Sequence, residues 1–371
     1  MDFTLSQAQD ELSTLCRHIL VDQLTQERLR AVESEPARFD RPLWSELAKA
    51  GILSATLPES LDGSGLGLLE QCSVLTEIGR TVAPVPYLAS ILLGASAIAT
   101  FGNAEQQARW VAPAGAGEVI LTVALSEEDN QDLLTPLTAA RETGPGWALT
   151  GSKTAVPAGT LADLLLVPAS TASGVAVFLI RPDDPGVSVY PQQVTGGDGT
   201  AYVELANTIV SADRVLGDLA SGSDILNWLA LRGTVGLCAA QLGVAERALE
   251  LTAEYARTRE QFGKPIGSFQ AVAQRLADAF IDVEGMRLTL WQAAWRLAND
   301  LPCDTEVATA KFWAADGGHR VAHTAVHVHG GVGIDMDGVV HRYFVAAKYN
   351  EFALGGATAQ LRRIGAALAA T

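Results

Sequence analysis

The stretch that decides the fold is Y-A-R-T-R-E-Q-F-G-K-P-I-G-S-F-Q, residues 255–270. Apolar residues before it recur at helical spacing, so the stretch begins as a helix. Gly263, Lys264 and Pro265 break that helix, and Ser268 is the predicted N-cap of the next one. The pattern therefore predicts two long helices joined by a sharp turn.

Three cations accompany an aromatic ring in this turn, since Arg257, Arg259 and Lys264 flank Phe262. The rest of the chain is acidic, and the formal net charge is -16 at pH 7. Guanidinium groups bind phosphate oxygens and a ring packs against a base, so the turn suits a planar ligand that carries phosphate. A solvated turn between two core helices is the alternative that the pattern alone leaves open.

Length and composition indicate a globular protein. The chain has 371 residues, of which 48% are hydrophobic and 18% charged, enough for two or three domains with a large core. The acidic balance argues against binding to nucleic acids or anionic membranes, because both need a basic protein surface. An anionic ligand would need a local basic cluster such as the turn above.

Cysteine usage and the apolar stretches favour a cytoplasmic protein. Four cysteines are far apart and form no C-x-x-C pair, so we expect buried, reduced thiols at Cys16, Cys72, Cys238 and Cys303. The N-terminus shows no signal-peptide pattern. Residues 225–245 are apolar and long enough to invite a transmembrane prediction, but Asn227, Arg232 and Gln241 interrupt them and favour a helix buried in a bundle.

The chain reads as three successive domains, predicted at residues 1–118 (α-helical), 119–220 (a small β domain) and 221–371 (a four-helix bundle). Short strands bounded by Gly, Pro, Asp and Asn are predicted at residues 147–150, 164–167, 175–180 and 202–205. Long helices are predicted near residues 225–258, 268–298, 305–329 and 340–370.

These features resemble the acyl-CoA dehydrogenase family over the whole chain. The motif R-x-x-F-G-x-x-I-x-x-F-Q after a helix that carries Tyr255 is similar to that family's FAD-contacting helix-turn-helix. A turn at residues 58–67 resembles its P-E-x-x-G-G-x-G loop. More narrowly, the chain resembles the subunit without a catalytic base in heterotetrameric acyl-CoA dehydrogenases of bacterial steroid (cholesterol) side-chain degradation. The resemblance implies a helical domain, a small β-barrel or sandwich, and a four-helix bundle.

In that family each flavin is shared between subunits, and the resemblance implies that this chain keeps the grip on the ADP half of FAD. Residues 327–333, H-V-H-G-G-V-G, resemble the family's Q-x-x-G-G-x-G, with His327 where glutamine is usual. Its glycines let backbone N–H groups approach a pyrophosphate. The cofactor-binding residues implied for the shared FAD are Arg259, Gln261, Phe262, Gln270, His327, Gly330 and Gly331.

The resemblance also implies that the pocket for the flavin ring is lost. Residues 125–132, L-S-E-E-D-N-Q-D, stand where the family has T-E-P-x-A-G-S-D, and their three successive acids would repel a phosphate. The family's G-x-K-x-[WF]-I-[TS]-N supplies an aromatic ring and a hydroxyl to the flavin. Here Ala155 and Pro157 occupy the matching positions.

The catalytic base is missing as well. Residues 354–363, L-G-G-A-T-A-Q-L-R-R, match the family's E-G-T-x-x-x-x-R and carry no carboxylate. The alternative location lies on the first bundle helix, where residues 225–245 contain no Asp or Glu. Abstraction of the proton α to a thioester needs a carboxylate within hydrogen-bond reach. Glu351 is the nearest acid, and it could serve only if the helix were shifted.

A metal site is the weaker interpretation of a histidine series in the third bundle helix. His319, His323 and His327 recur every fourth residue and so share one helix face. No Asp or Glu in the same run completes a ligand set, and we predict no metal.

The sequence therefore predicts a non-catalytic subunit of a heteromeric, FAD-dependent acyl-CoA dehydrogenase. A homologous catalytic partner would hold the flavin ring, the glutamate base and most of the acyl-CoA or steroid-CoA substrate, in a heterotetramer with two copies of each chain. Two alternatives stay open: a self-sufficient homotetramer with Glu351 as base, and a structural or regulatory protein that binds no flavin.

Overall fold

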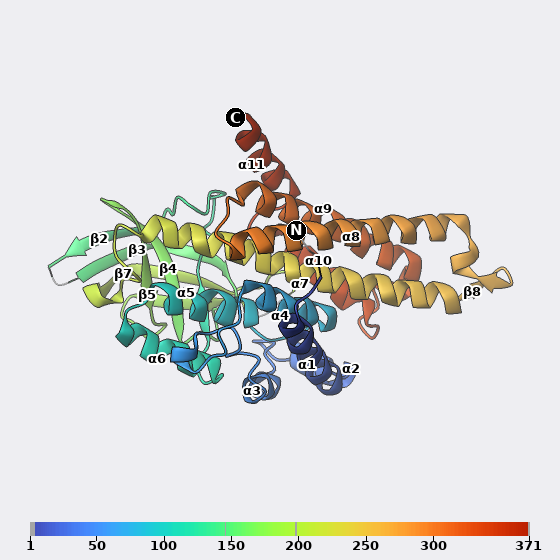
Figure 1. The fold of residues 1–371 in the computed structure, drawn as a ribbon, viewed down its shortest axis with the longest axis horizontal. Helices are drawn as coiled ribbons and strands as arrows, with labels where there is room; N and C mark the ends of the chain where they lie inside the picture. Colours follow the sequence, from blue (N-terminus) through green and yellow to red (C-terminus); the bar gives the residue numbers. More distant parts are fainter. Residues whose placement is uncertain (1–3, 145, 197–198, 370–371) are drawn as a thin grey trace. The chain divides into compact units, whose positions relative to one another are not determined.

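The computed structural model describes residues 4–144, 146–196 and 199–369. Helices precede and follow a curled β-sheet (Figure 1), which confirms the predicted fold class. The chain divides into two compact units that interleave in sequence. The bundle unit contains Met1–Gln26, Leu69–Ala83 and Thr234–Thr371, and the sheet unit contains Glu27–Leu68 and Pro84–Gly233. The domain boundaries near residues 118 and 220 stay predictions.

In the bundle unit, two N-terminal helices are joined by an ion pair. Helix α1 (Gln7–Gln23) begins after Ser6, whose hydroxyl accepts the N–H of Gln9 while the Gln9 side chain accepts the N–H of Ser6. Arg17 of α1 donates two hydrogen bonds, of 2.9 and 2.7 Å, to the buried carboxylate of Glu77 on α4 (Leu68–Thr81).

The helices of the sheet unit are short. They are α2 (Gln26–Glu33), α3 (Arg41–Lys49), η1 (Glu59–Leu61), the π-helix η2 (Leu88–Ala95), α5 (Ser96–Phe101) and α6 (Ala104–Gly115). Asp40 caps α3 by accepting the N–H of Leu43 at 2.9 Å, and Arg28 pairs with the same carboxylate at 2.6 Å. Trp44 of α3 is fully buried, as the amphipathic pattern around it requires.

The β-sheet has seven strands in the order β1-β4-β2-β3-β7-β6, with β5 beside β4. Their bounds are Leu121–Val123, Ala139–Thr143, Gly146–Val156, Leu164–Thr171, Gly174–Ile180, Val187–Pro191 and Ala201–Ser211, for β1 to β7. The four predicted strands lie within β3, β4, β5 and β7 and are confirmed. The sequence missed β1, β2 and β6, which are three to five residues long. The rings of Trp147 and Phe178 meet edge to face at 5.5 Å in the core of the sheet.

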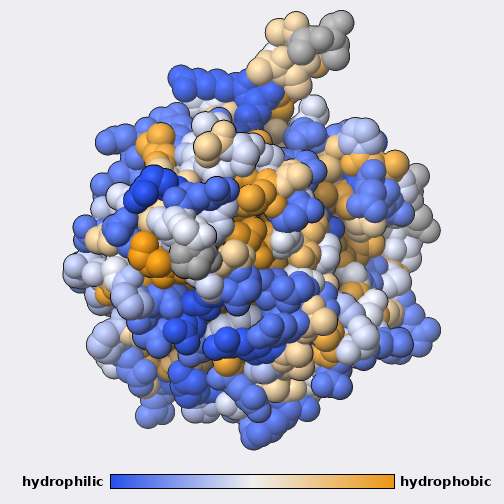
Figure 2. All heavy atoms as spheres, turned by 90° about the vertical axis from the view of Figure 1, so that its left-hand side faces the viewer, coloured by the Kyte–Doolittle hydropathy of each residue, from blue (hydrophilic) through white to orange (hydrophobic). Residues whose placement is uncertain are grey.

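Apolar surface remains at the sheet. Figure 2 looks onto the end of the molecule where Figure 1 draws β2 and β3, and it shows apolar atoms between broad hydrophilic areas. The large apolar side chains exposed on the strands and their loops include Leu134, Leu137, Tyr190 and Ile209.

Long helices make up the bundle unit, and α7 and α8 run side by side to a terminal hairpin (Figure 1). The helices are α7 (Gly222–Thr258), which belongs to this unit from Thr234 onward, α8 (Gln270–Ala298), α9 (Asp304–His329), α10 (Val340–Phe352) and α11 (Ala357–Ala369). Glycines let α4 approach α7, because a Cβ at Gly79 would lie 2.0 Å from the carbonyl oxygen of Ala240. The single helix predicted over residues 340–370 is wrong in its middle, where the chain bends between α10 and α11.

Helix α7 is long and apolar enough to cross a membrane by composition alone. However, 72% of its most apolar window of 18 residues is buried inside the protein, as in the core helix of a soluble bundle. The four cysteines are buried and none of them forms a disulfide, as expected for reduced thiols.

Candidate functional site

The turn after α7 is a two-residue β-hairpin. Strands β8 (Glu260–Gln261) and β9 (Lys264–Pro265) pair, and the residues between them, Phe262 and Gly263, have φ of 54° and 78°. Two successive positive φ values are what a type I′ turn requires. The predicted break of the helix is confirmed. Phe262 adopts a backbone conformation that is costly for a residue other than glycine, and its side chain is 93% exposed.

Ser268 is not the N-cap of α8. A 3-10 turn, η4 (Ile266–Ser268), follows the hairpin, and α8 begins only at Gln270 after Phe269. The Ser268 hydroxyl donates to the carbonyl oxygen of Pro265 at 2.7 Å, so it is not available to the first turn of α8. The N-cap prediction was wrong by one residue because the intervening turn has no signature in the helical periodicity.

Most of the predicted contact residues are exposed at this hairpin. Arg257, Arg259, Gln261 and Gln270 are exposed, and in the described part of the chain neither arginine side chain has a hydrogen-bond or ion-pair partner. The ammonium of Lys264 lies 4.5 Å from the ring centre of Phe269 rather than over Phe262. Two guanidinium groups are thus free to bind an anion from outside the chain.

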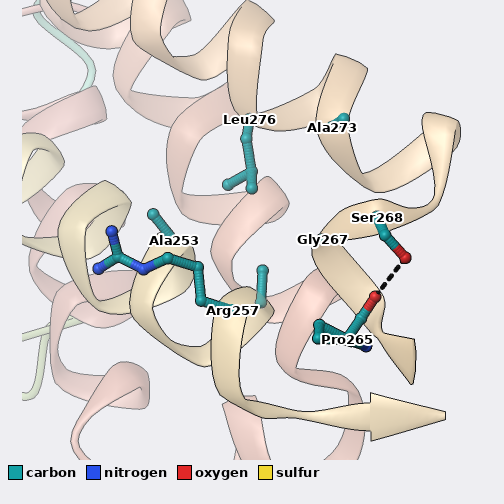
Figure 3. Close-up of a pocket in the computed structure, with 8 residues that line it drawn as sticks. Ala253, Arg257, Pro265, Gly267, Ser268, Ala273 and Leu276 are labelled. Carbon is teal, nitrogen blue, oxygen red and sulfur yellow. Dashed lines mark hydrogen bonds between the residues drawn. The ribbon is translucent and has the colours of Figure 1, made fainter. Parts of the chain in front are cut away.

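A hollow of about 400 Å³ lies beside Arg257 (Figure 3). Its wall consists mainly of small residues of α7, η4 and α8, and it also includes the stem of Arg257. In Figure 3 the Arg257 guanidinium points away from the Pro265–Ser268 turn, while Leu276 approaches the hollow from α8. This volume lies in the range of small-molecule pockets, about 300–1,000 Å³.

The glycine turn after α9 reaches the same end of the bundle. The imidazole of His329, the last residue of α9, stacks on the ring of Tyr255 with 4.4 Å between ring centres. Gly330 then has φ 64° and ψ -140°, a conformation essentially restricted to glycine. A Cβ at Gly330 or Gly331 would meet nothing within 4 Å, so the backbone here is open to a ligand. His327, one turn earlier, is exposed.

The chain bends where the resemblance places a catalytic base. Leu354 and Gly355 have φ of 54° and 98°. The buried Gln360 donates to the carbonyl oxygen of Gly355 at 3.0 Å and so stabilises the bend. A Cβ at Gly355 would lie 3.1 Å from Nε2 of Gln360, which leaves little room for a larger residue. No carboxylate occurs between the described helices α10 and α11.

Glu351, the nearest acid, is held by cations. Its carboxylate accepts from the Lys348 ammonium at 2.8 Å and lies 3.1 Å from Nδ1 of His319. Burial by itself would raise the pKa of Glu351, but the hydrogen bonds from Lys348 and His319 outweigh it, and the pKa is lowered. A carboxylate with a lowered pKa is a weak proton acceptor, so this environment does not suit a general base.

The histidine series does not form a metal centre in the described residues, which contain no group of three or more potential ligands. The rings of His319 and His323 stack at 4.2 Å, and the ring of Phe344 meets His323 edge-on at 5.2 Å. The ammonium of Lys348 lies 2.8 Å from Nδ1 of His319. A positive charge therefore already occupies the position that a metal ion would need.

In the sheet unit, the acidic run at residues 127–129 is not a row of solvated charges. Glu127 is buried, and one carboxylate oxygen accepts from Lys153 at 2.7 Å and from the Thr138 hydroxyl at 2.6 Å. Burial would raise the pKa of Glu127, but bonds from Lys153 and Thr138 lower it to about 2. The expected repulsion of phosphate by three acids is thus wrong for Glu127, and only Glu128 and Asp129 are exposed.

The positions matched to the flavin-contacting ring and hydroxyl carry neither group. Ala155 has a positive φ of 49°, and its N–H donates to the side chain of Gln192 at 2.7 Å. The carbonyl of Pro157 accepts from the Thr122 hydroxyl at 2.5 Å. Contacts within the chain therefore use these two backbone groups, and neither the Ala155 nor the Pro157 side chain can stack on a flavin or donate a hydrogen bond to it.

Comparisons with known proteins agree with this geometry. Residues 221–369 match the model described as acyl-CoA dehydrogenase, C-terminal domain, and residues 6–118 match the N-terminal domain of the same family. The chain is 53% identical over 379 residues to the acyl-CoA dehydrogenase FadE27 of Mycobacterium tuberculosis, and the match covers 100% of both chains.

Two solved structures are similar over nearly the whole chain. One is the crystal structure of the ChsE4–ChsE5 complex from Mycobacterium tuberculosis, with a TM-score of 0.96, 54% identity and 100% of both chains covered. The other is a variant of the Tcur3481–Tcur3483 steroid ACAD, with a TM-score of 0.93, 42% identity and 99% of both chains covered.

Proposed function

Because the chain belongs to the acyl-CoA dehydrogenase family, an oxidoreductase family that acts on CH–CH bonds, we propose that it is the non-catalytic subunit of a heteromeric member. The observation that carries this proposal is the bend between α10 and α11. The segment that should supply the base has no carboxylate, and the positive φ of Gly355 and the Gln360 side chain beside it oppose a larger residue there. Glu351, the nearest acid in the sequence, is bound by Lys348 and His319.

FAD is the cofactor expected for this family, and the residues present fit one half of it. The partner-free Arg257 and Arg259, together with the open backbone at Gly330 and Gly331, suit a diphosphate. The sheet unit does not suit the flavin ring, because Ala155 and Pro157 provide neither an aromatic side chain nor a hydroxyl group to contact it. We propose that Arg259, Gln261, Phe262, Gln270, His327, Gly330 and Gly331 contact the ADP half of an FAD whose ring the partner holds.

The partner would then carry out the chemistry. When bound, the flavin supplies the acceptor for the hydride from Cβ, and a glutamate of the partner removes the α-proton. We propose a heterotetramer with two copies of each chain and two FAD, located in the cytoplasm. The proposed substrate is the CoA thioester of a steroid side chain. The similarity to a steroid ACAD and to a two-protein complex supports these assignments.

The test is FAD stoichiometry combined with native mass, for this chain purified alone and co-expressed with a homologous catalytic subunit. We expect the lone chain to be colourless and the mixed tetramer to contain two FAD per four chains. A yellow lone chain with one FAD per chain would overturn the proposal and favour the homotetramer. A colourless mixed tetramer would favour the structural protein without flavin.

A further inference from the structure

Tyr255 and His329 form an aromatic contact between two segments that are far apart in the chain. Their ring centres are 4.4 Å apart and the ring planes are inclined by only 22°. His329 is 8% exposed. Its Nδ1 lies 2.8 Å from the carbonyl oxygen of Ala325, so Nδ1 carries the proton that it donates, and the orientation of the ring is set by α9 itself.

The backbone of each stacked residue is connected to one of the two segments proposed to bind the ADP half of FAD. Tyr255 is connected to the hairpin, and His329 to the glycine turn. The carbonyl oxygen of Tyr255 accepts the N–H of Arg259 at 2.8 Å, and the carbonyl oxygen of Arg259 accepts the N–H of Ile266 at 2.8 Å. The backbone of Arg259 is therefore fixed between α7 and η4. On the other side, His329 immediately precedes the strained Gly330.

Among the described residues, no hydrogen bond or ion pair joins the hairpin directly to the glycine turn. The hairpin is exposed from Arg257 to Pro265, and a Cβ at Gly330 or Gly331 would meet no atom within 4 Å. No described side chain of the hairpin or of the glycine turn thus bridges the two, and the half-buried Tyr255, stacked on the buried His329, joins the segments that precede them. The hydroxyl of Tyr255 has no hydrogen-bond partner in the described chain, so Tyr255 contacts His329 through its aromatic ring alone.

We infer that the Tyr255–His329 stack is a positioning element that fixes the arginines of the hairpin at the correct distance from the glycine turn, and thereby sets the affinity for the diphosphate. This inference rests on the proposed function. Neither residue touches the ligand. An aromatic pair contributes about 0.5–1.5 kcal/mol, which corresponds to roughly a two- to tenfold change in a binding constant.

The experiment measures the binding of ADP to the flavin-depleted heteromer by isothermal titration calorimetry, with its thermal unfolding as a second readout. Tyr255→Ala and His329→Leu are expected to weaken ADP binding by roughly two- to tenfold. Tyr255→Phe keeps the ring and should bind as tightly as the native protein. His323→Leu is the matched control, since it removes a stacked histidine from the same helix but away from the grip.

Arg259→Gln separates the inference from the proposed function. If Arg259→Gln weakens ADP binding, adding Tyr255→Ala to the Arg259→Gln variant should reduce the affinity for ADP little further. The arginine that Tyr255 positions is already absent from that variant. If Arg259→Gln weakens binding and Tyr255→Ala does not, the inference is wrong and the function stands. If His323→Leu weakens binding as much as His329→Leu, the effect is general destabilisation, and the inference is again wrong. If Arg259→Gln has no effect, the proposed function itself fails.

Discussion

Lys153 and Glu127 form an ion pair inside the sheet unit, with side chains 0% and 3% exposed. In the sequence Glu127 is one of three successive acids, which resembles a solvated charge run. Burial changes its role, because a buried carboxylate must be paired and hydrogen-bonded to stay charged. Lys153, Thr138 and two backbone N–H groups satisfy it, and together they hold the segment that stands in place of a flavin-binding loop.

We expect Lys153→Met to lower the free energy of unfolding by about 3–5 kcal/mol, because it leaves the Glu127 charge buried and unpaired. Urea unfolding followed by circular dichroism measures this change. Lys49→Met is the control, since Lys49 pairs with Glu46 on the surface and such a pair contributes under about 1 kcal/mol. The double variant Lys153→Met with Glu127→Gln should recover part of the loss. Equal losses for Lys153→Met and Lys49→Met would contradict the buried pair.

The elements agree with the sequence except for three short strands and for one helix break that the periodicity does not show. The periodicity of residues 340–370 predicts one helix, yet α10 ends at Phe352 and α11 begins at Ala357. One tertiary and one local contact stabilise the bend. Lys311, fully buried, donates to the carbonyl oxygen of Asn350 at the end of α10, and burial lowers its pKa to about 8. Gln360 donates to the carbonyl oxygen of Gly355 from the other side.

Gly355→Ala should lower thermal stability, by about 1–3 kcal/mol for the positive φ alone. The new Cβ would also crowd Gln360. Gly365→Ala is the opposite control: Gly365 lies inside α11 with nothing within 4 Å, so alanine there should stabilise the helix by about 0.5–1 kcal/mol. Differential scanning calorimetry of the two variants decides the matter. If Gly355→Ala left the thermal stability unchanged, the bend would not constrain residue 355.

For the whole molecule, the proposed binding site is a small basic region on an acidic protein. The net charge of -16 repels anions at long range. Only short-range hydrogen bonds from the arginines of the hairpin and from the open glycine backbone can overcome that repulsion. Residues 255 and 329 are brought together by the packing of α7 against α9, and the site therefore exists only in the folded bundle unit.

Arg259→Gln should weaken the binding of ADP to the heteromer by about tenfold or more, since a hydrogen bond to a charged group contributes about 1.5–3 kcal/mol. It should also make binding less sensitive to salt, because one charge-assisted contact is lost. Arg109→Gln removes the same charge from an exposed position of the sheet unit and should leave both properties unchanged. Titrations at low and physiological salt measure both. An equal loss of ADP affinity in the two variants would indicate that the net charge of the protein governs binding, and not a direct contact between Arg259 and the ligand.

The sequence by itself determined the properties that depend on local order or on which residue types are present. These include the helix break at Gly263–Pro265, four of the seven strands, and the lack of an acid at residues 354–363. Only the tertiary structure decided which distant groups meet. Lys153 neutralises Glu127, cations bind Glu351, and His329 stacks on Tyr255. The bend after Phe352 belongs to the same class. Each includes a contact between segments far apart in the chain, such as His319 with Glu351 or Lys311 with Asn350, and helical or strand periodicity carries no information about such contacts.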